Sequence, residues 1–193
     1  MKFITVQPDT DLSNPFTAGH VKVAETMESF AKTEELKISG HLTPYGITCS
    51  VTGNTSFFKN FDMKVRRQLE NATTDVIPTR SPYSNIIDLT SDILLDVGSV
   101  KFRIERTGVI RKLRNKLMRY TPITSNGSHI LYSKDTKLGA KISPVDLSSL
   151  GKIDWLEFRN QRITLRSLFI PNSDSELVNW LNAIEGLVKR IST

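Results

Sequence analysis

The C-terminal stretch IDWLEFRNQRITLRSLFIPNSDSELVNWLNAIEGLVKRI, residues 153–191, decides the fold class. Its first part alternates apolar and polar residues over 153–159 and again over 162–170, which is typical of strands with one buried face. Only Asn160 and Gln161 separate the two segments. We therefore predict a tight antiparallel hairpin.

The second part of this stretch predicts a helix. Pro171 ends the strand, and Ser173-x-x-Glu176 has the spacing of a capping box. Apolar residues then recur every three or four positions, as in an amphipathic helix over about 174–191. The residues of this stripe are Leu177, Leu181, Ile184, Leu187 and Ile191. Trp180 lies beside the stripe, and we expect it to pack on the sheet.

A second principal helix is predicted over about 56–71. Asn54, Thr55 or Ser56 can cap it, and four apolar residues fall on one helical stripe. These residues are Phe58, Phe61, Val65 and Leu69. The predicted fold class is α+β, with a mainly antiparallel sheet and principal helices near 56–71 and 174–191.

Turn signals place further hairpins along the chain. One covers 35–53 around Pro44-Tyr45-Gly46, and Asn126-Gly127 leads into a strand at 129–132. A short helix at 21–31 and a strand at 140–145 are also expected. The loop with Pro78 and Pro82 suggests two halves, an N-terminal hairpin-plus-helix half at 1–80 and a β-rich half at 83–193, which can also form one compact domain.

The charge is concentrated in the run KFRIERTGVIRKLRNKLMR, residues 101–119. Eight basic residues and one acid, Glu105, give this segment a net charge of +7, whereas the whole chain carries +6. Focused positive charge attracts polyanions, and arginine suits bidentate phosphate contacts. The predicted nucleic-acid-binding residues are Lys101, Arg103, Arg106, Arg111, Lys112, Arg114, Lys116, Arg119 and Tyr120.

The conformation of this run is open between two alternatives. Residues 99–105 alternate as a strand, with Phe102 and Ile104 inward and Arg103 and Glu105 outward. After the expected turn at 106–108, residues 109–123 fit either a return strand or a helix. In the strand alternative, Val109, Leu113 and Leu117 form the inner row.

Enzymatic and metal-binding motifs are absent from the sequence. The single Cys49 and the scattered His20, His41 and His129 lack metal-ligand spacing, and no phosphate-binding glycine loop or nucleophile elbow occurs. We therefore expect a non-enzymatic protein with no metal and no cofactor. No apolar run is long enough for a transmembrane helix, and a cytoplasmic location, possible also inside an infected host cell, is expected.

Residues 96–191 resemble a pleckstrin-homology domain. GVIRKLRNKLMRYTPI, from Gly108, looks like that family's first two strands, SHILYSKD like its third, and LEFRNQRITLRSLFI like its late hairpin. DSELVNWLNAIEGL is similar to its terminal helix, with Trp180 at the family's tryptophan. The resemblance implies a module that binds an anionic head group or a peptide, with Lys112, Arg114 and Lys116 near that site.

A looser analogy of architecture relates the chain to the Whirly and Pur groups of nucleic-acid-binding proteins. The leading functional prediction is sequence-tolerant binding of RNA or single-stranded DNA, with phosphate contacts from the basic run and stacking on Phe102, Tyr120 or Tyr132. The alternatives are the pleckstrin-like module and a structural or assembly protein with an acidic protein partner or a homo-oligomeric state. Only six alanines occur, a bias common in AT-rich viral and phage genomes.

Overall fold

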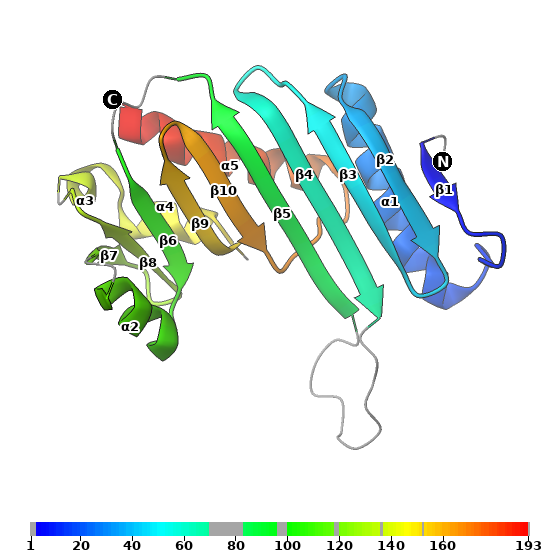
Figure 1. Ribbon diagram of the computed structural model, residues 1–193, viewed down its shortest axis with the longest axis horizontal. Coiled ribbons are helices and arrows are strands. Elements are labelled where there is room, and N and C mark those ends of the chain that lie inside the picture. The colour runs from blue at the N-terminus through cyan, green and yellow to red at the C-terminus, as the bar shows by residue number, and fades with distance from the viewer. Residues whose placement is uncertain are drawn as a thin grey trace.

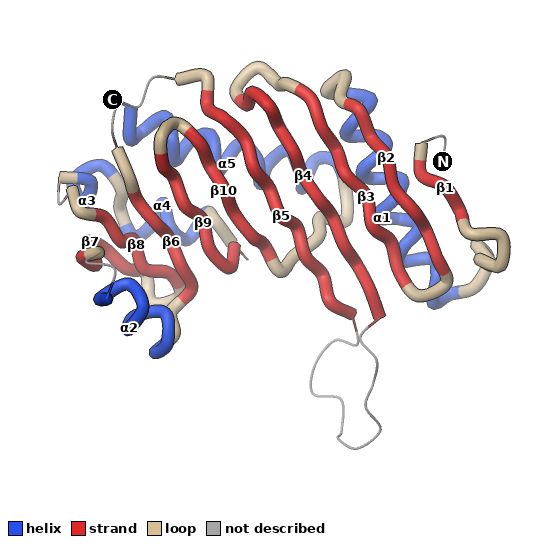
Figure 2. The backbone as a smooth tube through the Cα atoms, in the orientation of Figure 1, coloured by secondary structure: helices blue, strands red, loops and turns tan. Residues whose placement is uncertain are grey.

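A ten-stranded, mostly antiparallel sheet forms the body of the protein (Figures 1 and 2). The computed structural model describes residues 3–69, 83–95, 100–117, 120–135, 137–151 and 153–192. The strand order is β1-β2-β3-β4-β5-β10-β9-β6-β8-β7, and only the β1–β2 pair is parallel among the described strands. The strands are β1 Ile4–Val6, β2 Lys37–Thr43, β3 Gly46–Gly53, β4 Phe58–Leu69, β5 Tyr83–Ile93, β6 Phe102–Arg106, β7 Thr121–Ser125, β8 His129–Ser133, β9 Ile153–Arg159 and β10 Arg162–Ser167.

The helices are distributed unevenly over the two faces of this sheet. They are α1 Pro15–Thr33, α2 Val109–Leu117, α3 Leu138–Lys141, α4 Pro144–Ser149 and α5 Asp174–Ser192. Figure 1 shows the long helices α1 and α5 behind the sheet, whereas α2 lies at the near side below β6 and β8. The near face of the central strands carries no helix in the described part of the chain.

The apolar core lies between the sheet and the two long helices. It joins both halves of the chain, since Met63 and Leu89 belong to the same buried cluster as Leu165 and Ile184. Strand β5 pairs with β10, so the expected halves 1–80 and 83–193 contribute to one continuous sheet. Together these elements confirm the predicted α+β class with a mainly antiparallel sheet.

The predicted C-terminal helix is confirmed as α5. Ser173 caps it as expected, because the Glu176 backbone N–H donates to Ser173 Oγ at 3.2 Å; the Glu176 carboxylate reaches back one residue further than in the capping box and accepts from the Asn172 backbone N–H at 2.7 Å. Trp180 and Leu181 are both 7% exposed. The apolar stripe therefore faces the core.

The predicted hairpins are also confirmed. Strands β2 and β3 pair around residues 43–46, and β7 and β8 pair around Asn126-Gly127. Asn160 and Gln161 connect β9 to β10 with φ values of 52° and 59°. Two residues in the left-handed region form the two-residue turn whose twist matches that of the flanking strands.

The predicted helix at 56–71 is wrong, because this segment forms the long strand β4. Phe61, Met63 and Val65 point to the core and pair in antiparallel register with β3 and β5. The register shifts between Lys59 and Asp62, and Asn60 there has a φ of 52°. This bulge turns Phe58 inward as well, so a strand reproduces the helical spacing of the apolar residues.

Two other local expectations are corrected. The expected strand at 140–145 is not formed, because the segment covers the end of α3 and the start of α4; Ile142 between the two helices and Leu147 of α4 are fully buried. Of the two conformations considered for 109–123, a return strand or a helix, the structure forms helix α2 and then strand β7. The segment that resembled the first strand of a pleckstrin-homology domain is thus helical from Val109 to Leu117.

Candidate functional site

The face of the sheet opposite α1 and α5 is polar. Strand residues alternate across the two faces, so the register of neighbouring strands defines one polar row after another. Arg103 stands beside Glu157, and the row continues through Thr164 and Thr90 to Asp62. We call this surface of β2, β3, β4, β5, β10, β9 and β6 the open face.

The open face carries more positive than negative charge. Its described cationic side chains are Lys37, Lys59, Lys64, Arg66, Arg103, Arg159, Arg162 and Arg166, and its acidic ones are Asp62, Asp88, Asp92, Glu105 and Glu157. The open face thus carries an excess of three cations in a chain with a net charge of +6. A face with this bias attracts anions.

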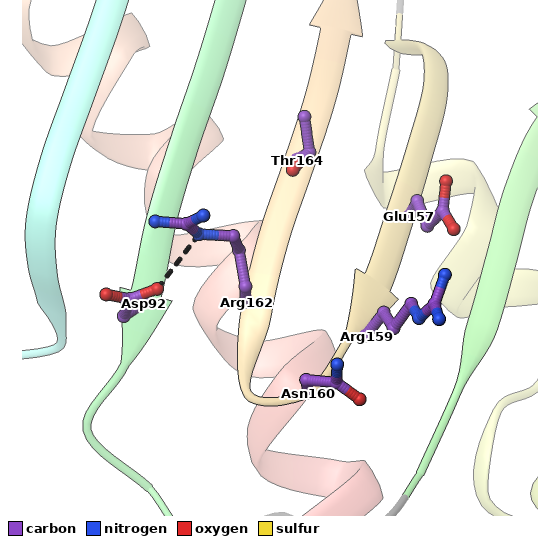
Figure 3. Close-up of a pocket in the computed structure, with 6 residues that line it drawn as sticks. All are labelled: Asp92, Glu157, Arg159, Asn160, Arg162 and Thr164. Atoms are coloured by element: carbon purple, nitrogen blue, oxygen red, sulfur yellow. Dashed lines mark hydrogen bonds and ion pairs between the residues drawn. The ribbon is translucent and has the colours of Figure 1, made fainter.

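Cross-strand ion pairs fix part of this charge. Arg166 Nε donates to Asp88 Oδ1 at 2.7 Å, and Arg162 Nε donates to Asp92 Oδ1 at 3.0 Å (Figure 3). Asn60 also donates to Asp92, at 2.8 Å. This hydrogen bond, together with Arg162 and Lys59, lowers the pKa of Asp92 below its ordinary value, so the aspartate stays charged.

A shallow cavity of about 410 Å³ lies at the turn between β9 and β10. Figure 3 shows Arg162 turned toward Asp92, and Arg159 on the side of Glu157. Asn160 and Thr164 complete the polar lining. Arg159 is exposed and has no ion-pair partner among the described residues, so its guanidinium remains available for an anion.

The predicted basic run does not form one continuous cationic strip, because a buried carboxylate gathers part of it. Glu105 is 1% exposed and forms ion pairs with Arg103 and Arg114. The Asn115 side chain donates to Glu105 Oε2 at 2.8 Å and is itself fully buried. Arg103 also reaches Glu157 at 3.5 Å. Arg103 and Glu105 do lie on the face opposite Phe102 and Ile104, as expected, but α2 covers them and keeps them from solvent.

A second acid holds the start of α2. Arg111 donates from Nη2 to both carboxylate oxygens of Asp154 at 2.9 Å, and from Nη1 to the Asp154 backbone carbonyl at 2.8 Å. These charge-assisted hydrogen bonds, from one guanidinium to the side chain and the backbone of one residue, fix the position of Arg111. Beside it, Arg106, Thr107 and Ser128 line an open cavity of about 440 Å³.

The predicted site residues thus divide into two groups. Arg103, Arg111 and Arg114 are engaged in ion pairs that hold α2 on the sheet. Lys101, Arg106, Lys112 and Lys116 are exposed and have no ion-pair partner in the described part of the chain. Arg119 lies outside the described residues, and Tyr120 is half-buried.

The aromatic residues suggested for base stacking are mostly inaccessible. Phe102 is fully buried and stacks on Phe158, with ring centroids 5.4 Å apart. Tyr132 is 4% exposed, and burial raises the pKa of its hydroxyl. Trp155, which sequence reasoning did not select, is half-buried on the open face with Arg103 at 5.8 Å from its ring. Its ring is therefore partly accessible to a ligand on this face.

Sequence reasoning also missed the cations outside the basic run. Arg66 and Arg159 come from β4 and β9, which are far apart in sequence but belong to the same face. The alternation of basic residues such as Lys64 and Arg66 at a spacing of two could have predicted a strand with one cationic face. The helix predicted at 56–71 assigned these residues to a different pattern.

Two further features of the described residues bear on the type of site. Among the described residues, no three or more His, Cys, Asp or Glu side chains come together as metal ligands. Within the same residues, no helix has the length and apolar character needed to cross a membrane.

No protein-family model matches this chain, and no curated protein matches it. The chain is similar to a solved structure described as the crystal structure of the mycobacterial trehalose monomycolate transport factor A, TtfA. The two share 10% sequence identity over 88% of this chain and 94% of that chain, with a TM-score of 0.49. At this level the likeness gives no information about the ligand of this chain.

Proposed function

We propose that this protein is a non-enzymatic binder of RNA or single-stranded DNA that contacts the phosphate backbone without sequence preference. The observation that carries the proposal is the open face, a broad sheet surface that no long helix of the described residues covers and on which the described cations outnumber the acids. Phosphate contacts supply most of the affinity in sequence-tolerant binding, and they need exposed cations.

Six of the exposed cations that have no ion-pair partner among the described residues support these contacts. Lys101, Arg106, Lys112 and Lys116 lie at the α2 end of the sheet, while Arg66 and Arg159 lie on its open face. Arg162 and Arg166 already pair with aspartates, so a phosphate must compete with Asp92 and Asp88 for them. The unpaired cations therefore provide the main phosphate contacts.

A single strand fits this surface better than a duplex. Trp155 offers a partly exposed ring on the open face, where an unstacked base can lie. Base stacking on an aromatic side chain contributes about 1–3 kcal/mol per base and tolerates any sequence. A duplex keeps its bases inside and cannot use this ring.

Fluorescence anisotropy with a labelled 20-nucleotide RNA, the equivalent single-stranded DNA and a duplex, over a salt series, tests the proposal. If six phosphates are neutralised on a single strand, the logarithm of affinity falls against the logarithm of salt concentration with a slope of about −4, from roughly 0.7 per phosphate. Arg66→Gln/Arg159→Gln should flatten the slope by about 1.4 and weaken all sequences equally.

Lys22→Gln/Lys32→Gln is the matched control. It removes the same charge from exposed positions of α1, on the opposite side of the sheet. This control should keep nearly the full affinity. Wild-type protein that binds none of the three nucleic acids at low salt would refute the proposal, and equal loss in both double variants would show that only net charge matters.

A further inference from the structure

Helix α2 has the opposite orientation to that of an ordinary surface helix. Among its residues 111–117, the fully buried one is Asn115, and Arg111 and Arg114 form ion pairs with acids of the sheet. Its leucines point away from the protein, with Leu113 60% exposed and Leu117 77% exposed. The predicted inner row of Leu113 and Leu117 is therefore the outer row. Exposed large apolar side chains next to each other mark an interaction surface.

The charge around these leucines has one sign. Lys112 and Lys116 each precede a leucine, so the two lysines and the two leucines form adjacent stripes at a spacing of four residues. The nearby acids Glu105 and Asp154 lie beneath the helix, with side chains only 1% and 14% exposed. The outer surface of α2 thus presents leucines bordered by cations.

We propose that α2 docks this protein on the surface of a lipid bilayer that contains anionic lipids. The leucines enter the boundary between head groups and acyl chains, and the lysines remain at the level of the lipid phosphates. Anionic head groups complement the cations, and each cation near such a surface strengthens binding by about 1 kcal/mol, roughly fivefold.

A bilayer fits α2 better than a protein partner. Nine helical residues offer far less than the ~800 Å² per partner of a stable protein interface, and the neighbouring open face is polar. A bilayer requires no such minimum, because the apolar area of the inserted side chains and the attraction of cations to anionic lipids each add to the binding strength. The inference goes beyond nucleic-acid binding, in which phosphates make no use of Leu113 and Leu117.

Vesicle co-sedimentation tests the inference. The full chain is mixed with vesicles of phosphatidylcholine alone or with 30% phosphatidylglycerol (on the order of physiological anionic content). We expect binding to the anionic vesicles and little to the neutral ones. Leu113→Gln/Leu117→Gln should reduce partitioning at least about tenfold, and Lys112→Gln/Lys116→Gln about 25-fold from two fivefold losses.

The matched control is Leu94→Gln/Leu168→Gln, which removes two leucines that are 56% and 45% exposed elsewhere on the surface. It should partition like the wild type, and all variants should keep the wild-type melting temperature. The leucine variant of α2 should retain oligonucleotide affinity, which separates this inference from the proposed function.

Three results would overturn the inference. The first is wild-type protein that does not sediment with anionic vesicles. The second is an α2 leucine variant that partitions like the wild type. The third is a wild-type dimer, measured by light scattering, that the leucine substitutions dissociate while vesicle binding is absent, which would assign α2 to contact with a second copy of this chain.

Discussion

The replacement Glu105→Gln tests whether one buried carboxylate holds α2 on the sheet. Glu105 is 1% exposed; it forms an ion pair with Arg103 of β6 and accepts hydrogen bonds from Arg114 and Asn115 of α2. Glutamine keeps the shape of the side chain but removes its charge. The two guanidinium groups then lose their counter-ion. The NH₂ group of the new amide also faces the N–H donors of the surrounding side chains, with which it cannot form a hydrogen bond.

The loss in free energy of unfolding depends on how well Arg103 and Arg114 can replace their contact with the Glu105 carboxylate. Removing one member of a buried ion pair costs about 3–5 kcal/mol. The side chain of Arg114 is 47% exposed and can regain water, and Arg103 keeps Glu157 at 3.5 Å. We therefore expect the lower end, about 3 kcal/mol, which for a chain of this size lowers the melting temperature by roughly 6–12 °C.

Thermal and urea unfolding, followed by circular dichroism, measure this change. Glu157→Gln is the matched control, because its carboxylate is 29% exposed and makes a single contact with Arg103 at 3.5 Å. It should cost less than about 1 kcal/mol. In the double variant with Arg114→Gln, the losses should fall short of additivity by at least about 1 kcal/mol. A Glu105→Gln protein that melts within 2 °C (a shift of roughly 1 kcal/mol or less) of wild type would refute the reasoning.

Further predictions concern the core. Trp180→Ala should lower the free energy of unfolding by roughly 2–5 kcal/mol, because Trp180 is buried on α5. The control Leu168→Ala removes an exposed side chain and should cost less than about 1 kcal/mol. Equal urea midpoints for the two variants would show that α5 is not docked. Burial, and to a lesser degree Glu28, raises the pKa of Cys49 to about 12. The native thiol should therefore not react with a disulfide reagent at pH 8, whereas the unfolded chain should react once in denaturant. The raised pKa also means that folding favours the protonated thiol, so the free energy of unfolding should fall as pH rises from about 9 to about 12, unlike that of Cys49→Ala.

Local sequence signals decided much of this fold. The alternation over 153–159 and 162–170, the Asn160-Gln161 turn and the Ser173 helix cap each depend on residues close together in the chain, and the structure confirms all three. These signals suffice because turn conformations and helix caps are short-range properties of the backbone. The α+β class followed from them.

Tertiary structure alone decided the conformation of 56–71 and the role of the basic run. A bulge at Asn60 allows a strand to imitate helical spacing, and only pairing with β3 and β5 distinguishes the two. The run reads as a strip of +7 because its neutralising acids, Asp154 and Glu157, are distant in sequence. Ion pairs depend on distance in space, so the sequence could locate the cations but not their partners. The fold decided which cations pair with acids, and it turned Leu113 and Leu117 outward.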